Sequence, residues 1–312
     1  MHGDGMRTLL IAAAVAACHS THPEAVMTVT SQAHRIPVLD SFFAYREAGA
    51  GRPIVFLHGN PTSSYVWRGI LPVLAPHAHC LAPDLIGMGR SGKPESAYRY
   101  ADHVRYLDAW FDALDLRDVV IVGYDWGGVL ALDWASRHPE RVRGVVVFET
   151  ILQPLSWAEY PPAGAELFRK LRMPGAGEQL VLEDNGFLPR SLGNGVKSGL
   201  SAADRAEYEA PFPTPASRRP MLAWTRSLPI DGEPADTTAV VARNAAWLAT
   251  TKVPTLLLTF DGTGLSNAPA VVAWASQLPS VTVRALGPAG HHAPEDAPLP
   301  IAAAIEAWAA TL

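Results

Sequence analysis

The chain has 312 residues, of which 48% are apolar and 18% are charged, and its formal net charge is −5. This length and composition provide enough bulk for one large α/β domain, or for a core with an insertion. A negative net charge without any block of Lys or Arg excludes the basic surface that a nucleic-acid or anionic-membrane partner needs. Only two cysteines occur, Cys18 and Cys80, so a disulfide framework or a cysteine-based metal site is also excluded.

The first residues resemble an export signal. Arg7 precedes the apolar run 9–17, which is too short to span a bilayer but fits the core of a signal peptide. Cys18 follows this run directly, as the lipidated cysteine of a bacterial lipoprotein does, so export with a lipid anchor is one interpretation. The other is that translation begins at Met27 and the protein is cytoplasmic. Under both interpretations residues 1–28 are a signal peptide or an unstructured extension outside the fold.

Short apolar strands alternate with amphipathic helices from residue 52 onward. Strands are predicted at 54–57, 79–82, 119–122, 142–148, 255–260 and 281–286. A helix is predicted over 100–114, where apolar residues recur at spacings of three and four, and a closing helix over 300–310. This alternation predicts an α/β fold with a mostly parallel sheet flanked by helices. Functional side chains are then expected at the carboxyl ends of the strands.

Residues 151–230 interrupt this rhythm. They are rich in Pro, Gly, Trp and Arg, and they contain short helical segments, such as 163–171 and 202–209, without a clear strand. We interpret this stretch as a helical cap inserted into a single core, because the alternation of strands and helices resumes near residue 253. The core then consists of 29–150 and 231–312.

The strand 119–122 leads into the turn Gly-Tyr-Asp-Trp-Gly at 123–127. Flanking glycines permit the sharp strand-to-helix turn that lifts the central side chain of a hydrolase nucleophile into a pocket. Asp125 stands at that central position, where a carboxylate can displace a leaving group from saturated carbon and form an ester. The alternative is that Asp125 only caps the following helix, a position that Asp favours.

A carboxylate nucleophile needs a base to activate water, and His291 follows the last predicted strand. Two acids compete to orient this imidazole, Glu149 and Asp261, since each ends a core strand. We favour Glu149, because a Glu that closes an apolar run has no local reason to be there, whereas Asp-Gly is a common turn pair. The order nucleophile, acid, base is that of the α/β-hydrolase fold. His292 is expected to point elsewhere, as a packing or pocket-rim residue.

Asn60 and Trp126 offer N–H donors near the nucleophile. Asn60 follows a core strand, so its amide is expected to project toward the same crevice, and Trp126 adjoins Asp125. Two such donors in apolar surroundings suit a large, weakly hydrated anion. The backbone N–H groups of the same residues are expected to form an oxyanion hole.

From about residue 53 to its end the chain resembles the haloalkane dehalogenases. The resemblance rests on four segments: HGNPTSSY at 58–65, PDLIGMG at 83–89, DWG at 125–127 and EDN at 183–185. Glu149 and the Glu-Asp pair at 295–296 fit as well. The subgroup that this chain resembles has an Asp-His-Glu triad and an Asn-Trp halide pair.

The resemblance implies a hydrolase that converts a halogenated aliphatic substrate and water into an alcohol, a halide ion and a proton. Asp125 would attack the halogen-bearing carbon, while Asn60 and Trp126 hold the departing halide. His291, oriented by Glu149, would then activate water against the alkyl-aspartate ester. No metal and no organic cofactor is implied.

Three alternatives remain at this point. An epoxide hydrolase would use the same Asp and His but needs paired cap tyrosines, for which Tyr160 and Tyr208 are the candidates. A luciferase-like monooxygenase shares the constellation but needs a pocket for a large aromatic substrate. A ligand-binding protein on an inactive scaffold has no need of the complete triad.

The chain also departs from the resembled family at three positions. Tyr124 stands where the family often has His, His292 where it often has Phe, and Thr225 where a Pro is usual. None of these changes removes a catalytic group. We expect them to alter the width, polarity and substrate range of the pocket.

Overall fold

The computed structural model of the chain describes residues 32–160, 162–261 and 264–312. Within these ranges eight strands form one sheet, in the spatial order β1-β2-β4-β3-β5-β6-β7-β8. Their bounds are β1 Gln32–Val38, β2 Ser41–Ala48, β3 Pro53–Leu57, β4 His79–Pro83, β5 Val119–Tyr124, β6 Val142–Phe148, β7 Thr255–Asp261 and β8 Val281–Pro288. The pairs β1/β2 and β2/β4 are antiparallel, and the other neighbouring pairs are parallel. The predicted mostly parallel sheet is confirmed.

Strands β3 to β8 lie where the apolar runs predict them, whereas the hairpin of β1 and β2 falls in a segment without a predicted strand. The reason lies in exposure. The central strand β5 is buried along its whole length, so all its residues are apolar or glycine. Strand β1 is at the edge of the sheet and most of its side chains are exposed or half-buried, so it carries no apolar run.

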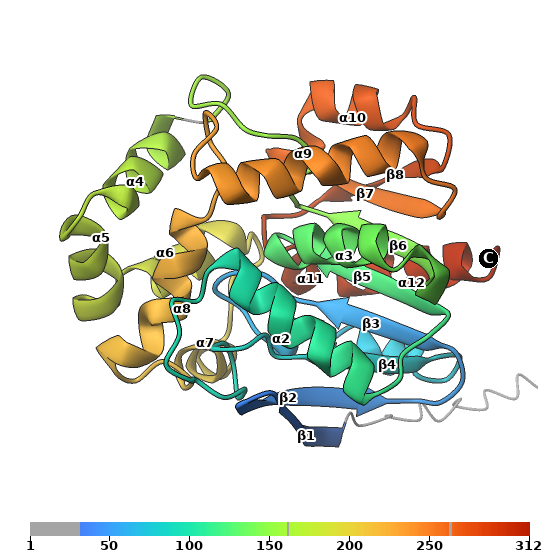
Figure 1. Cartoon of the computed structure of the whole chain (residues 1–312), viewed down its shortest axis with the longest axis horizontal. Helices are drawn as coiled ribbons and strands as arrows, with labels where there is room; N and C mark the ends of the chain where they lie inside the picture. The colour runs from blue at the N-terminus through green and yellow to red at the C-terminus, as the bar shows by residue number, and fades with distance from the viewer. Residues whose placement is uncertain (1–31, 161, 262–263) are drawn as a thin grey trace, which may run out of the picture.

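Helices cover both faces of the sheet (Figure 1). On the near face in this view lie α2 Tyr100–Ala113, α3 Trp126–Arg137 and α9 Ala235–Thr250, and α3 contacts both α2 and α9. On the far face, α1 Leu71–Leu74 packs against α12 Pro298–Ala309. The closing helix therefore begins two residues earlier than predicted, because proline is well tolerated in the first turn of a helix. The remaining helices of this part are α10 Pro269–Ala275 and α11 Ala293–Asp296.

A run of helices lies between β6 and β7, at one end of the sheet (left in Figure 1). It comprises α4 Pro162–Arg172, α5 Ala176–Glu178, a π-helical turn Gln179–Glu183, α6 Phe187–Gly195, α7 Ala202–Glu209 and α8 Pro215–Arg226. The helical insert is thus present, and α9 follows it against the core helix α3. The limits of the cap at residues 151 and 230 stay a prediction.

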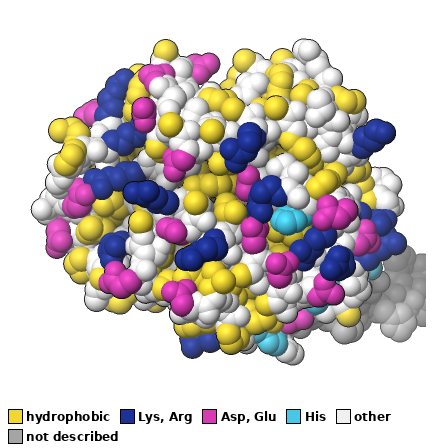
Figure 2. All heavy atoms as spheres, viewed as in Figure 1, with side chains coloured by type: hydrophobic (Ala, Val, Ile, Leu, Met, Phe, Trp, Pro, Cys, Tyr) yellow, Lys and Arg dark blue, Asp and Glu magenta, His cyan; other side chains and the backbone are white. Residues whose placement is uncertain are grey.

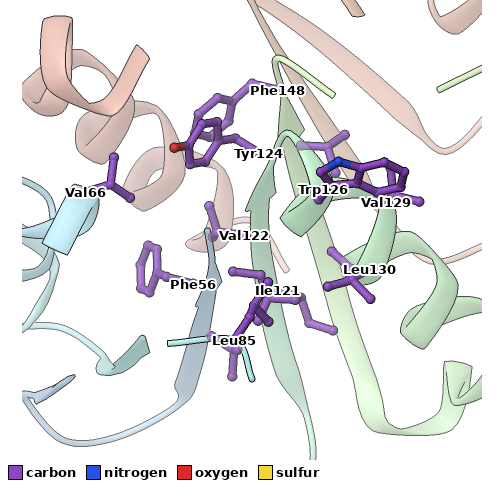
Figure 3. Close-up of a cluster of buried hydrophobic side chains, with 14 of the residues drawn as sticks. Phe56, Val66, Leu85, Ile121, Val122, Tyr124, Trp126, Val129, Leu130 and Phe148 are labelled. Carbon is purple, nitrogen blue, oxygen red and sulfur yellow. The ribbon is translucent and has the colours of Figure 1, made fainter. Parts of the chain in front are cut away.

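The interior of the core is apolar and densely aromatic around β5. Figure 3 shows Ile121 and Val122 of β5 amid core side chains, with the Tyr124 ring beside Phe148; the two rings stack with centroids 5.8 Å apart. On the surface, the face in Figure 2 mixes cationic and anionic side chains without a block of either sign. In the described part of the chain, no helix combines the length and apolarity needed to cross a membrane. The export signal and Cys18 lie outside the described residues.

Candidate active site

The turn after β5 presents Asp125 at the start of α3. Its backbone has a φ of 51°, the left-handed region that residues other than glycine rarely adopt. Gly127 makes the turn feasible, because a Cβ atom there would lie 2.0 Å from the carbonyl oxygen of Leu57. The Asp125 side chain makes no capping hydrogen bond to α3. Instead, its Oδ1 atom accepts a hydrogen bond of 2.7 Å from the backbone N–H of Asn60. This geometry rules out the alternative that Asp125 serves only as a helix cap.

His291 lies on the loop after β8 and joins two carboxylates. Its Nε2 atom lies 3.4 Å from Oδ2 of Asp125, and its Nδ1 atom lies 3.2 Å from Oε2 of Glu149. Glu149 is 1% exposed and directly follows β6, with a φ of 47°. Asp261, the competing acid, is exposed at the end of β7, and its backbone carbonyl accepts a hydrogen bond from Lys197. The structure therefore brings Glu149 to the imidazole and leaves Asp261 on the surface.

The two carboxylates change the protonation of His291. Burial by itself favours the neutral imidazole, but the hydrogen bonds and negative charges of Asp125 and Glu149 outweigh it and raise the pKa of His291 to about 10. The resting site thus favours the protonated form of His291.

Asn267 also holds Glu149, although the sequence analysis did not single it out. Its Nδ2 atom donates to Oε1 of Glu149, the oxygen that His291 does not use. Its own Oδ1 atom accepts a hydrogen bond from the backbone N–H of Phe260. Asn267 lies in a short turn before α10, and no local pattern distinguishes it from the other polar loop residues.

Asn60 and Trp126 both line a cavity of about 250 Å³ together with Asp125 and His291. The Nδ2 atom of Asn60 donates to the carbonyl of Met221 at 3.3 Å, while its Oδ1 atom is buried and has no hydrogen-bond partner among the described residues. Because Nδ2 carries two N–H hydrogens and the Met221 carbonyl accepts from one of them, a second donor remains at the cavity wall, whereas Oδ1 can only accept.

An aromatic stack holds the Trp126 indole in place. Trp224 of α8 lies against it with ring centroids 4.7 Å apart and an interplanar angle of 29°. On the other side, His103 of α2 stacks on Trp224 at 3.9 Å. The stack joins the turn that carries the nucleophile, the helical insert and the core helix α2.

The rest of the cavity wall is mainly apolar and comes from the helical insert. Its apolar and aromatic side chains are Tyr160, Leu167, Phe168, Phe187 and Leu228. Thr225 also lines the cavity, but its hydroxyl donates to the carbonyl of Leu222 at 2.8 Å. The Thr225 hydroxyl thus uses its donor within its own helix, so Thr225 adds less polarity to the cavity than expected. A second, larger pocket of about 650 Å³ shares Tyr160, Asn194 and His291 with this cavity and reaches Glu149.

The two tyrosines of the epoxide-hydrolase alternative are not paired. Tyr160 lines the cavity. Tyr208 is buried, its hydroxyl donates to Glu295, and its ring packs edge-on against Tyr65 with centroids 5.4 Å apart. Since opening an epoxide needs acids at the reacting oxygen, a single cavity tyrosine does not supply the pair.

Comparison with known proteins decides among the remaining alternatives. The family described as the α/β hydrolase fold matches residues 52–298. A haloalkane dehalogenase of Mesorhizobium japonicum is 45% identical over 289 residues, which are 92% of this chain and 93% of that protein. The chain belongs to the haloalkane dehalogenase family. A second haloalkane dehalogenase, from Agrobacterium fabrum, is 42% identical over 89% of this chain and 91% of its own length.

Solved haloalkane dehalogenases share the fold of the whole core. The structure of DbeA from Bradyrhizobium elkani aligns with a TM-score of 0.87 at 43% identity, over 90% of this chain and 98% of that one. DatA from Agrobacterium tumefaciens aligns with a TM-score of 0.86 at 42% identity, over 90% and 97%. Membership of this family makes the chain a hydrolase that acts on carbon–halide bonds.

Proposed function

We propose that this haloalkane dehalogenase uses Asp125 as the nucleophile, His291 as the general base and Glu149 as the acid that orients it. The observation that carries the proposal is the arrangement of Asp125, whose Oδ1 atom is fixed by a backbone N–H while its Oδ2 atom faces the imidazole. A carboxylate fixed in this way is held for attack and has a base beside it for the later hydrolysis.

In the first step, one carboxylate oxygen of Asp125 attacks the halogen-bearing carbon of a halogenated aliphatic substrate. A carbon–oxygen bond forms as the carbon–halogen bond breaks, and the halide leaves with the bonding electron pair. Asn60 and Trp126 are proposed to hold this anion, because both line the cavity that Asp125 enters. The apolar wall excludes water, which strengthens these donors and the attack of the carboxylate.

In the second step, water cleaves the ester. His291 takes a proton from the water as its oxygen attacks the carboxyl carbon of Asp125, and the backbone N–H of Asn60 is proposed to stabilise the oxyanion with that of Trp126. Glu149 stabilises the imidazolium through Nδ1. The ester bond breaks, the leaving alkoxide takes the remaining proton of the added water and departs as the alcohol, and Asp125 is a carboxylate again. One proton is released over the whole reaction.

The size of the cavity limits the substrate. At about 250 Å³ it is smaller than the roughly 300–1,000 Å³ of pockets that hold drug-sized ligands, so we propose short halogenated aliphatics as substrates. We further propose that residues 151–230 act as the cap over this cavity, because most of its wall belongs to that segment.

The proposal is tested by incubating the protein with short brominated and chlorinated alkanes and measuring halide and acid together. We expect equal amounts of both from the wild type and neither from Asp125→Asn, which keeps the shape of the side chain but removes the nucleophile. Styrene oxide serves as the control for epoxide opening. Diol formation from styrene oxide without halide release from any alkane would contradict the proposal.

A further inference from the structure

Four polar side chains form a chain of contacts beside the active site; we call Thr62, Tyr124, His292 and the half-buried Ser191 the polar chain. The Thr62 and Tyr124 hydroxyls lie 2.6 Å apart. The Tyr124 hydroxyl lies 3.4 Å from Nδ1 of His292, and Nε2 of His292 lies 3.1 Å from Oγ of Ser191. Thr62, Tyr124 and His292 are each 0% exposed. Unbroken contacts therefore run from the loop after β3 to helix α6.

The polar chain reaches the reacting groups through sequence neighbours and through the Tyr124 ring, whose centroid lies 6.2 Å from that of His291. Tyr124 directly precedes Asp125, and His292 directly follows His291. Ser191 lies on α6 and lines the cavity. The chain therefore links the turn of the nucleophile, the loop of the base and one wall of the cavity.

Backbone contacts bring α6 and the loop of the base close together at the same place. The N–H of His292 donates to the carbonyl of Gly195, the last residue of α6, at 2.8 Å. A Cβ atom at Gly195 would lie 2.6 Å from Cδ2 of His292, so the helix approaches the imidazole more closely than any side chain there would permit.

Asp296 links the same two segments through its side chain. Its carboxylate accepts hydrogen bonds from the N–H groups of Lys197 and Ser198, which follow α6, and from that of Gly290, which precedes His291. The distances are 3.0, 2.7 and 2.7 Å. The end of α6 and the loop 290–292 are thus joined by backbone bonds, and the polar chain extends this junction toward the cavity.

A neutral imidazole satisfies both neighbours of His292. It offers one donor and one acceptor, and the hydroxyls of Tyr124 and Ser191 can each take either role. Burial, reinforced by the positive charge of His291, keeps the pKa of His292 well below its usual value. All members of the chain are thus satisfied together, which makes a buried polar network rigid.

We propose that His292, through Tyr124 and Ser191, is a positioning residue that holds α6 against the loop of the base and thereby sets the length of substrate that the cavity accepts. The inference rests on the proposed function, since it concerns the same cavity. If the link is broken, α6 can move outward. Short substrates then lose contact with the wall, whereas longer ones gain room.

The test compares His292→Phe, Tyr124→Phe and Ser191→Ala, which remove polar members of the chain; Tyr124→Phe and Ser191→Ala do so at nearly constant volume. We expect the ratio of kcat/KM for 1-bromohexane to that for 1-bromoethane to rise about 2- to 10-fold, as befits the loss of one or two hydrogen bonds. The change should lie mainly in a higher KM for the short substrate. Effects of the single variants should not add in the double variant His292→Phe/Ser191→Ala, because both break the same link.

Tyr106→Phe is the matched control. Its ring is buried and its hydroxyl donates to Asp40, which lies in the turn between β1 and β2 at the edge of the sheet, so it loses one partly buried hydrogen bond without touching the polar chain. It should lower stability but leave the substrate ratio unchanged. His292→Gln, whose amide can retain the bond to Ser191, should restore part of the wild-type ratio.

Hydrogen exchange of the α6 amides provides a readout that needs no activity. We expect faster exchange over residues 187–196 in His292→Phe and Ser191→Ala, but not in Tyr106→Phe. Unchanged exchange and an unchanged substrate ratio in Ser191→Ala, the least disruptive variant, would overturn the inference. A wild type that releases no halide would overturn the proposed function instead, and the exchange experiment would still decide whether the link exists.

Discussion

At the scale of single residues, the protonation state of His291 must change during the reaction. His291 must be neutral to accept a proton from water, yet Asp125 and Glu149 together keep it protonated in the resting site. Formation of the ester resolves the conflict, because it removes the negative charge of Asp125. With one carboxylate left, the pKa of His291 falls and the imidazolium loses its proton, so the base is generated only once there is an ester to hydrolyse.

This argument predicts that a proton leaves the protein during alkylation and not only with the final product. In a rapid-mixing experiment with a pH indicator in weak buffer, acid should appear in the same fast phase as the halide. His291→Gln should release halide in that phase without the proton. Acid that appears only at the rate of alcohol formation would show that the imidazole is already neutral in the resting site.

A second prediction concerns the covalent intermediate. His291→Gln should still be alkylated but should not hydrolyse the ester, so its intact mass should rise by that of the alkyl group after incubation with a bromoalkane. The double variant with Asp125→Asn is the control and should keep its original mass. An unmodified His291→Gln protein, despite halide release over many turnovers, would contradict the assignment of the base.

Particular residues show how far the site could be predicted from the sequence. Asp125, Glu149 and His291 each follow a strand, so topology alone brings them to one edge of the sheet, and the structure places them in contact. The bond between Tyr124 and His292 could not be predicted, because it joins residues 168 positions apart whose hydroxyl and ring meet only after the core has packed.

At the scale of elements, burial decided what could be predicted. Strands β3 to β7 carry runs of buried residues, whereas most side chains of β1, at the edge of the sheet, are exposed or half-buried, and half of those of β2 are half-buried. Helix α9 lies in the predicted core but was not predicted as a helix, because its residues are weakly amphipathic and rich in Ala and Thr. Exposure thus removes the pattern on which such predictions depend.

Substitution of Gly by Ala should have opposite effects on stability at two positions of this protein. Gly127→Ala should lower the free energy of unfolding by about 1–3 kcal/mol or more, because the new Cβ atom would lie 2.0 Å from the backbone of β3. In Gly193→Ala, on helix α6, the new Cβ atom has no atom within 4 Å. This substitution should raise the free energy of unfolding by about 0.5–1 kcal/mol. Urea denaturation of the two variants measures both changes. A stable, active Gly127→Ala protein would mean that the turn can relax without moving Asp125.

At the scale of the whole molecule, the site should affect how the stability of the protein depends on pH. His291 has a pKa of about 10 in the folded protein, above the roughly 6.5 of an unfolded chain. The folded state therefore binds the proton more tightly. This contribution to stability is fully present below about pH 6.5 and is lost as the pH rises toward 10.

We therefore predict that the difference in Tm between the wild type and His291→Gln changes steadily in favour of the variant from pH 6.5 to 10. Other titrating groups contribute to both proteins and largely cancel in this difference. Thermal melts at half-unit intervals of pH provide the measurement. A difference that stays constant over this range would mean that folding leaves the affinity of His291 for its proton unchanged.

The stack of His103, Trp224 and Trp126 gives the molecule an optical property. Two nearly parallel indoles 4.7 Å apart couple their electronic transitions, and one of them belongs to the helical insert while the other lies at the proposed halide site. If the insert swings away from the core, the indoles separate and the exciton signal in the near-ultraviolet circular dichroism collapses. Movement of the helical insert relative to the core can thus be followed in the unlabelled protein by a single spectroscopic signal.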